Sequence, residues 1–101
     1  MNDKIIGMLG LARRAGALIY GSDSTAQKIR FGKVYLAIVA NDASDRTKKL
    51  IRNKSTSFNV PMYEYSTAAE LGAKLGKSDI SVISVSDRNF AKAIINIITS
   101  N

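Results

Sequence analysis

The first part of the chain alternates between a helical and a strand spacing of hydrophobic residues. Residues 5–15 repeat at the helical period, which predicts an amphipathic helix. Residues 18–20 form a short apolar run that predicts a strand, and Gly21 interrupts it. We then expect a helix over residues 22–31, because Gly32 is well placed to end it.

The middle of the chain holds its longest strand candidate, residues 34–40, which is continuous and rich in β-branched side chains. Such a run is typical of a strand covered on both faces. Residues 41–44 supply several possible N-caps, and a basic helix is then expected to reach about residue 57. Three apolar residues of this helix and its end are expected to pack inward: Leu50, Ile51 and Phe58.

The last part repeats the alternation. A short strand is expected over residues 62–65, and residues 67–70 have the pattern of a capping box that opens a helix ending at Gly76. Residues 80–85 predict a further strand, and Asp87 can cap a final amphipathic helix.

This order of elements predicts an α/β fold, a three-layer α/β/α sandwich with a small, largely parallel sheet. Its length fits one domain over residues 1–101, since no linker, repeat or low-complexity tract divides the chain. Hydrophobic residues make up 46% of the sequence, which is enough for a packed core.

Charge indicates what the surface would bind. Fifteen Lys and Arg against eight Asp and Glu give a formal net charge of +7. Residues 1–54 carry eleven basic and four acidic residues, whereas residues 55–101 carry four of each, so the whole excess lies in the first half. Solubility alone would explain some of this charge, but the bias favours a polyanionic partner.

The absence of Cys and His from the sequence narrows the chemistry. It removes disulfides, zinc sites, thiol nucleophiles and imidazole acid–base catalysis, so we expect a binding protein and no enzyme, metal or cofactor. The N-terminal residues lack a secretory signal, and no apolar run approaches the length of about 18 residues that a membrane span requires. We therefore expect a cytoplasmic protein without a membrane or small-molecule partner.

The segment from Gly21 to Arg30 has the chemistry of a contact surface. A glycine lets another molecule approach the backbone, and the free N–H groups of a helix start suit phosphate oxygens or base edges. Polar and basic side chains surround it. A purely structural interpretation stays open, because Ser22 could be an N-cap, and Ser24 with Gln27 has the spacing of a capping box.

The order of several modest motifs adds to this picture. A glycine ends the first short strand and precedes a polar helix start; a second glycine precedes a hydrophobic strand that a polar pair follows. These residues are Gly21, Ser22-Asp23-Ser24, Gly32, Lys33 to Ala40, and Asn41-Asp42. Val60-Pro61-Met62-Tyr63, the Glu-Leu-Gly helix of residues 70–76, and residues 80–87 follow in turn. Together they resemble the kink-turn-binding ribosomal protein family of the L7Ae and L30e type, in its short bacterial form, over nearly the whole chain.

The resemblance implies a four-stranded mixed sheet and an RNA-binding protein. Kink-turn RNA bends sharply beside sheared G·A pairs, and its widened groove can be read where a regular A-form groove cannot. The candidate partners are therefore structured RNA, ribosomal or regulatory, and the ribosome. The implied RNA-binding residues are Gly21, Ser22, Asp23, Ser24, Gln27, Lys28, Lys33, Asn41, Asp42, Lys77, Ser78, Asp79 and Ile80.

The resemblance also implies separate roles. Gly21 would allow backbone approach, while Ser22, Asp23, Ser24 and Gln27 would read base edges. Lys28 and Lys33 would contact phosphates, and residues 77–80 would cover an extruded base.

The sequence departs from the family at this helix start. Archaeal and eukaryotic members commonly have Gly-Thr-Asn-Glu there and a Lys one turn on, where this chain has Gly-Ser-Asp-Ser and Gln27. An ionised Asp23 can only accept hydrogen bonds, which still suits the N–H groups of guanine. We therefore expect weaker or altered kink-turn binding.

Two other interpretations stay open. The first alternative is a ribosome-associated protein-interaction module with general RNA affinity. The second is an accessory recognition domain of an RNA-modifying enzyme.

Overall fold

The computed structural model describes residues 3–100 of the chain, and helices and strands alternate along it. The elements are α1 (Asp3–Arg14), β1 (Leu18–Tyr20), α2 (Ser22–Arg30), β2 (Leu36–Val39), α3 (Asp45–Ser57), β3 (Met62–Glu64), α4 (Ala68–Lys74), β4 (Val82–Val85) and α5 (Arg88–Thr99). The predicted helices and strands are present in the predicted order.

The four strands form one mixed sheet in the order β1-β4-β2-β3. β4 pairs antiparallel with both β1 and β2, whereas β2 and β3 are parallel. The largely parallel sheet expected from the alternation of elements is therefore wrong, and the mixed sheet implied by the resemblance is confirmed.

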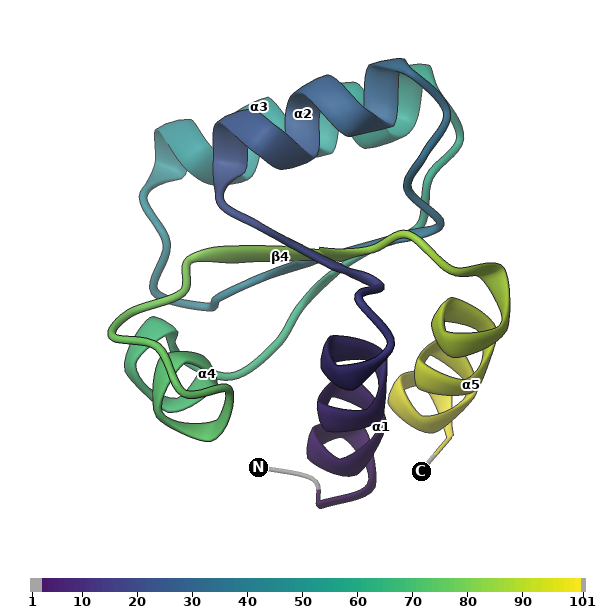
Figure 1. Ribbon diagram of the computed structural model, residues 1–101. Coiled ribbons are helices and arrows are strands. Elements are labelled where there is room, and N and C mark those ends of the chain that lie inside the picture. Colours follow the sequence, from purple (N-terminus) through teal and green to yellow (C-terminus); the bar gives the residue numbers. More distant parts are fainter. Residues whose placement is uncertain (1–2, 101) are drawn as a thin grey trace.

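The helix before β4 explains the difference. β1, β2 and β3 run in the same direction, because α2 and α3 each carry the chain back across the sheet. α4 has only seven residues, about 10 Å of helix, and stays at the edge where β3 ends (Figure 1). β4 therefore starts from that edge and runs in the opposite direction.

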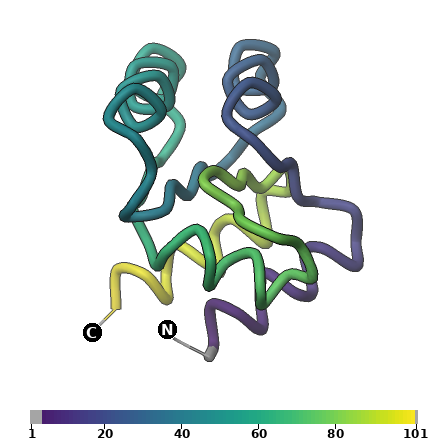
Figure 2. The backbone as a smooth tube through the Cα atoms, turned by 90° about the vertical axis from the view of Figure 1, so that its left-hand side faces the viewer, coloured from purple at the N-terminus to yellow at the C-terminus, as the bar shows by residue number. Residues whose placement is uncertain are grey.

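Helices cover both faces of the sheet, as the three-layer prediction requires. α2 and α3 lie side by side on one face, and α1, α4 and α5 lie on the other (Figures 1 and 2). The side chains of β2 alternate between the two layers: Leu36 and Ile38 belong to the core under α1, α4 and α5, and Ala37 and Val39 to the core under α2 and α3. All four residues are fully buried, which confirms a strand covered on both faces.

One predicted core residue is exposed. Ile51 is buried and Leu50 partly buried, but Phe58 keeps 46% of its surface accessible. α3 ends at Ser57, so Phe58 leaves the helical stripe that buries Ile51 and Ser55. The expectation that Phe58 packs inward is therefore wrong.

Among residues 3–100, no helix is both long enough and apolar enough to cross a membrane.

Candidate functional site

The segments expected to bind RNA meet at one edge of the sheet. β1 and β2 end there and β4 begins there, because β4 is antiparallel to both. The N–H of Gly21 donates to the C=O of Val82 (2.9 Å), and the N–H of Ala40 donates to the C=O of Ser81 (2.8 Å). α2 and α3 also begin on this side, at the left of Figure 1. We call residues 20–24, 41–44 and 77–82 the helix-start edge.

The start of α2 is open. Gly21 is its N-cap, with φ 98° and ψ 155°, a conformation that is strained for any residue with a Cβ. Among the described residues, none supplies a side-chain cap to α2. The first residue of the helix is Ser22, so the alternatives of an N-capping Ser22 and of a capping box from Ser24 to Gln27 are both wrong.

The next three helices begin differently. Ser44, Thr67 and Asp87 cap α3, α4 and α5, each accepting a hydrogen bond from an N–H three residues on. The first-turn N–H groups of α2 thus have the geometry that suits an incoming acceptor, and the positive end of the helix dipole favours an anionic one.

A groove of about 400 Å³ joins the start of α2 to the loop before β4. Gly21 and Ser22 line one side, and Lys77, Asp79 and Ile80 line the other. Five of the predicted residues, far apart in the sequence, therefore meet around one hollow.

A contact between a cation and an aromatic ring crosses this groove. The Nζ of Lys77 lies 4.5 Å from the centre of the Tyr20 ring, within the range of a cation–π interaction. The loop is therefore held against the end of β1 by a contact that a ligand could displace or share.

A glycine in α4 fixes the loop before β4. A Cβ on Gly72 would lie only 1.5 Å from the carbonyl oxygen of Ser78, so the loop backbone occupies the space that any other side chain needs. The N–H of Lys77 donates to the C=O of Gly72 (2.8 Å), and the N–H of Ile80 donates to the C=O of Ala68 (3.0 Å). Ser78 itself is exposed on this loop.

Other predicted residues lie on the outward face of α2. Asp23, Ser24, Gln27 and Lys28 are all exposed. The inward residue Thr25 is fully buried, and its hydroxyl is 2.9 Å from that of Ser84 on β4. This buried hydrogen bond anchors α2 to the sheet and leaves its polar face toward solvent.

Lys33 lies apart from the helix-start edge. It follows the other end of α2, where its N–H donates to the C=O of Lys28 (3.0 Å). The nine residues of α2 separate it from Gly21 by about 14 Å. Any contact of Lys33 with RNA would therefore be a second, distant one.

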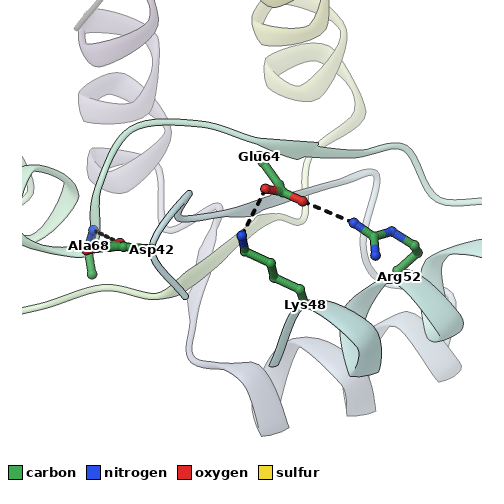
Figure 3. A network of polar contacts seen from close by, with 5 residues as sticks. All are labelled: Asp42, Lys48, Arg52, Glu64 and Ala68. Carbon is green, nitrogen blue, oxygen red and sulfur yellow. Dashed lines mark hydrogen bonds and ion pairs between the residues drawn. The ribbon is translucent and has the colours of Figure 1, made fainter. Parts of the chain in front are cut away.

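Asn41 and Asp42 are exposed at the end of β2, but their nearest partners are within the protein. The carboxylate of Asp42 accepts a hydrogen bond from the N–H of Ala68 (2.9 Å), at the start of α4 (Figure 3). The N–H of Asn41 donates to the C=O of Ser66 (2.8 Å). The pair therefore joins β2 to α4.

An ion-pair cluster lies beside this edge on the α3 side. Glu64 on β3 pairs with Lys48 (3.2 Å) and Arg52 (3.0 Å), as Figure 3 shows. Two of the cations of α3 are therefore occupied by one carboxylate. Among residues 3–100, no group of acidic side chains is placed to hold a metal ion.

Four residues that line the groove were not predicted from the sequence. Thr47 reaches the groove from α3, Tyr20 ends β1, and Ser81 and Val82 lie at the start of β4. Ser81 adjoins the predicted loop and could have been included with it. No sequence pattern around Thr47 indicated a place in the groove. Only the parallel packing of α2 and α3 brings the first turn of α3 close to Gly21.

Comparisons with known proteins agree on one family. The family model described as ribosomal protein L7Ae/L30e/S12e/Gadd45 family matches residues 3–95. A protein named RNA-binding protein YlxQ from Enterococcus faecium is 42% identical over 89 residues, covering 88% of this chain and 85% of that protein. Its namesake from Bacillus subtilis (strain 168) is 33% identical over 91 residues, covering 90% of this chain and 91% of that protein.

A ribosomal protein and a solved structure extend the similarity. The large ribosomal subunit protein eL30 of Sulfurisphaera tokodaii is 36% identical over 76 residues, covering 73% of this chain and 72% of that protein. The structure of a protein of unknown function from Bacillus halodurans C superimposes with a TM-score of 0.92 at 32% identity, covering 96% of this chain and 98% of that one. The family resemblance of the sequence is thus confirmed, and the chain belongs to the ribosomal protein L7Ae/L30e/S12e/Gadd45 family.

Proposed function

We propose that this protein is an RNA-binding protein rather than an enzyme, and that it recognises kink-turn RNA at the helix-start edge. The observation that carries the proposal is the uncapped start of α2, which shares one groove with the loop before β4. The names of the YlxQ and eL30 relatives, an RNA-binding protein and a ribosomal protein, support the RNA-binding part.

The start of α2 would read the bent part of the RNA. Gly21 leaves room for close approach, and the free N–H groups of the first turn can donate to phosphate or base oxygens. The exposed carboxylate of Asp23 can accept from guanine N1–H and N2–H, which sheared G·A pairs present in a widened groove. Ser22, Ser24 and Gln27 add hydroxyl and amide groups along the same surface.

The surrounding residues would hold the RNA in place. Lys28 and Lys33 are exposed cations for the phosphate backbone, with Lys33 contacting it at the far end of α2. Residues 77–80 would cover a base that leaves the stack, with the exposed Lys77, Ser78 and Asp79 facing the base and the buried Ile80 anchoring the loop to the core.

A binding titration tests the proposal with two RNAs, a kink-turn and a straight duplex in which Watson–Crick pairs replace the G·A pairs. We expect tighter binding of the kink-turn. Asp23→Ala should reduce that preference by about tenfold, since a good polar contact to a base discriminates by about 1–3 kcal/mol in the comparable DNA case.

Lys77→Glu should weaken binding of the kink-turn, whereas Lys92→Glu should not. Both lysines are exposed and the charge change is identical, but Lys92 lies on α5, in the layer opposite α2. Equal affinity for the bent and the straight RNA would contradict kink-turn recognition and leave a general RNA binder.

A further inference from the structure

The ends of α2 and α3 repeat one arrangement on the side of the molecule opposite the helix-start edge. The two helices are parallel neighbours, and both end at the right of Figure 1. Each has a phenylalanine as its C-cap, Phe31 in α2 and Phe58 in α3. A residue with positive φ follows each one, Gly32 at 72° and Asn59 at 57°.

Both phenylalanines face solvent. Phe31 is 62% exposed and Phe58 is 46% exposed. This exposure is no requirement of the helix ending, because Leu75 has the same position in α4, before Gly76 at φ 71°, and is only 1% exposed. The C-cap position of a helix in this protein can therefore be buried, as Leu75 is. At the ends of α2 and α3, however, the same position holds a phenylalanine ring exposed to solvent.

A groove of about 270 Å³ lies between the two helix ends. Ile29, Gly32 and Val34 line it from α2 and its continuation, and Phe58, Val60 and Pro61 line it from the end of α3. We call this groove and the two rings the Phe31/Phe58 surface. Its lining is mostly apolar, with Tyr35 and Asn59 as the polar members, and Phe31 stands beside it at the end of α2. The groove therefore offers stacking and van der Waals contact and few fixed hydrogen bonds.

The charges around this surface are cationic. Arg30 and Lys33 are exposed and Lys54 is partly exposed, and among the described residues none of them pairs with a carboxylate. The carboxylate of Glu64, beside the helix-start edge, is shared by Lys48 and Arg52. Cations at a helix C-terminus are also stabilised by the helix dipole, so the charge alone would not indicate a ligand. The two exposed rings do indicate a ligand. Cations contact phosphates and exposed aromatic rings stack on bases, so together they suit a nucleic acid.

We propose that the Phe31/Phe58 surface is a second RNA contact, which binds unpaired bases of a single-stranded segment. The rings of Phe31 and Phe58 stack on bases, and Arg30, Lys33 and Lys54 contact the phosphates between them. Stacking on aromatic side chains is the common mode of single-strand recognition and tolerates any base, since each base has a π-face. An acidic peptide would also pair with the cations. It has no bases, however, so it would cover less of the two phenylalanine rings than a nucleic acid does.

This second contact does not depend on kink-turn recognition. It lies at the other end of α2, about 14 Å from Gly21, so both surfaces can be occupied at once. Failure of either proposal leaves the other testable, because Phe31 and Phe58 take no part in the kink-turn contact and the two test RNAs differ, even though Lys33 belongs to both surfaces.

The test measures fluorescence anisotropy of labelled twelve-nucleotide oligoadenylate and oligouridylate with the full chain. Phe31→Ala combined with Phe58→Ala should weaken binding of both by about tenfold or more, and oligoadenylate should bind more tightly because purines stack better. Replacing both residues with Tyr should retain most of the affinity, because the rings remain.

Three comparisons decide the outcome. Leu11→Ala is the matched control, since Leu11 is 49% exposed on α1 and its truncation should leave oligonucleotide binding unchanged. The double Ala variant should bind kink-turn RNA without a single-stranded extension as the unchanged protein does. Unchanged oligonucleotide affinity in the double Ala variant, or an equal loss in Leu11→Ala, overturns the proposal and leaves the surface to a protein partner.

Discussion

Gly72 shows how a single position in α4 can control a loop that it does not belong to. Its missing side chain leaves the space that the Ser78 carbonyl occupies, and its own carbonyl accepts from the Lys77 N–H. The loop before β4 is thus shaped by backbone contact with a helix. A change at Gly72 acts on the helix-start edge without touching any group that faces the groove.

We predict that Gly72→Ala displaces this loop. The added Cβ meets backbone atoms, which cannot rotate away, so the free energy of unfolding should fall by about 1–3 kcal/mol. RNA affinity should fall with it, because Lys77 and Ile80 move. Urea unfolding and the kink-turn titration measure the two effects.

Gly7→Ala is the matched control for that change. Gly7 is exposed inside α1, and a Cβ there has no atom within 4 Å. The substitution should stabilise the protein by about 0.5–1 kcal/mol, the usual gain from replacing a helical glycine. An equally stable Gly72→Ala variant would show that the loop is free to shift and that its position is not set by Gly72.

Site residues that follow local sequence rules could be predicted, whereas those that depend on long-range contacts could not. Gly21 and the polar start of α2 follow from local rules, because glycine and short polar side chains mark such turns wherever they occur. The role of Thr25 depends on Ser84, which is distant in the sequence, so no local pattern could reveal their hydrogen bond. Asp42 was assigned to RNA contact, but its carboxylate also bonds to the start of α4.

At the scale of the element, α4 depends on contacts at its first turn. Thr67 caps it by accepting from the Glu70 N–H (3.2 Å), and Asp42 adds a bond to the Ala68 N–H. The predicted capping box is half formed, since the Glu70 carboxylate accepts instead from the Ser66 hydroxyl (3.0 Å). A seven-residue helix is marginal alone, so these contacts and the buried Leu71 hold it in place.

We predict that Asp42→Ala lowers the free energy of unfolding by about 0.5–2 kcal/mol, the usual cost of a lost helix cap. Asp42→Asn should retain most of the stability, because its side-chain oxygen still accepts a hydrogen bond. Asp45→Ala, at the exposed first turn of α3, serves as control and should cost less, about 0.3–1 kcal/mol. Urea unfolding of the three variants checks this, and equal costs for Asp42→Ala and Asp45→Ala would contradict it.

The type of each element could be predicted, but not every strand direction. Periodicity depends on which faces are buried, and it identified the strands and helices well. Pairing direction depends on whether a connecting helix returns the chain across the sheet. α2 and α3 do so, whereas α4 does not, and their sequence patterns do not differ in a way that reveals it.

At the scale of the whole molecule, which has a net charge of +7, exposed cations lie near both ends of α2. Lys77 lies in the groove at the helix-start edge, and Arg30 and Lys33 lie beside the Phe31/Phe58 surface. RNA binding by this protein should therefore weaken steeply as salt rises, because each phosphate contact releases counterions.

We predict that Lys28→Gln, which removes an exposed cation assigned to the phosphate backbone, flattens this salt dependence for kink-turn RNA. The slope of log K against log salt should change by about 0.7–0.9, the amount expected for one lost phosphate contact. Lys92→Gln removes an equivalent exposed charge from α5 and should leave the slope unchanged. Titrations at four salt concentrations measure it, and identical slopes for the two variants would show that Lys28 contacts no phosphate.

Because the start of α2 has no side-chain cap, the stability of this helix is coupled to ligand binding. A capping side chain usually contributes about 0.5–2 kcal/mol to a helix, and Gly21 has none to offer. Any bound group whose oxygens meet those N–H donors completes the helix from outside. Because linkage is reciprocal, a change that orders α2 and leaves its first-turn N–H groups free also makes the protein a better receptor. An internal cap at this position would instead occupy those N–H groups and compete with the ligand from within the same chain.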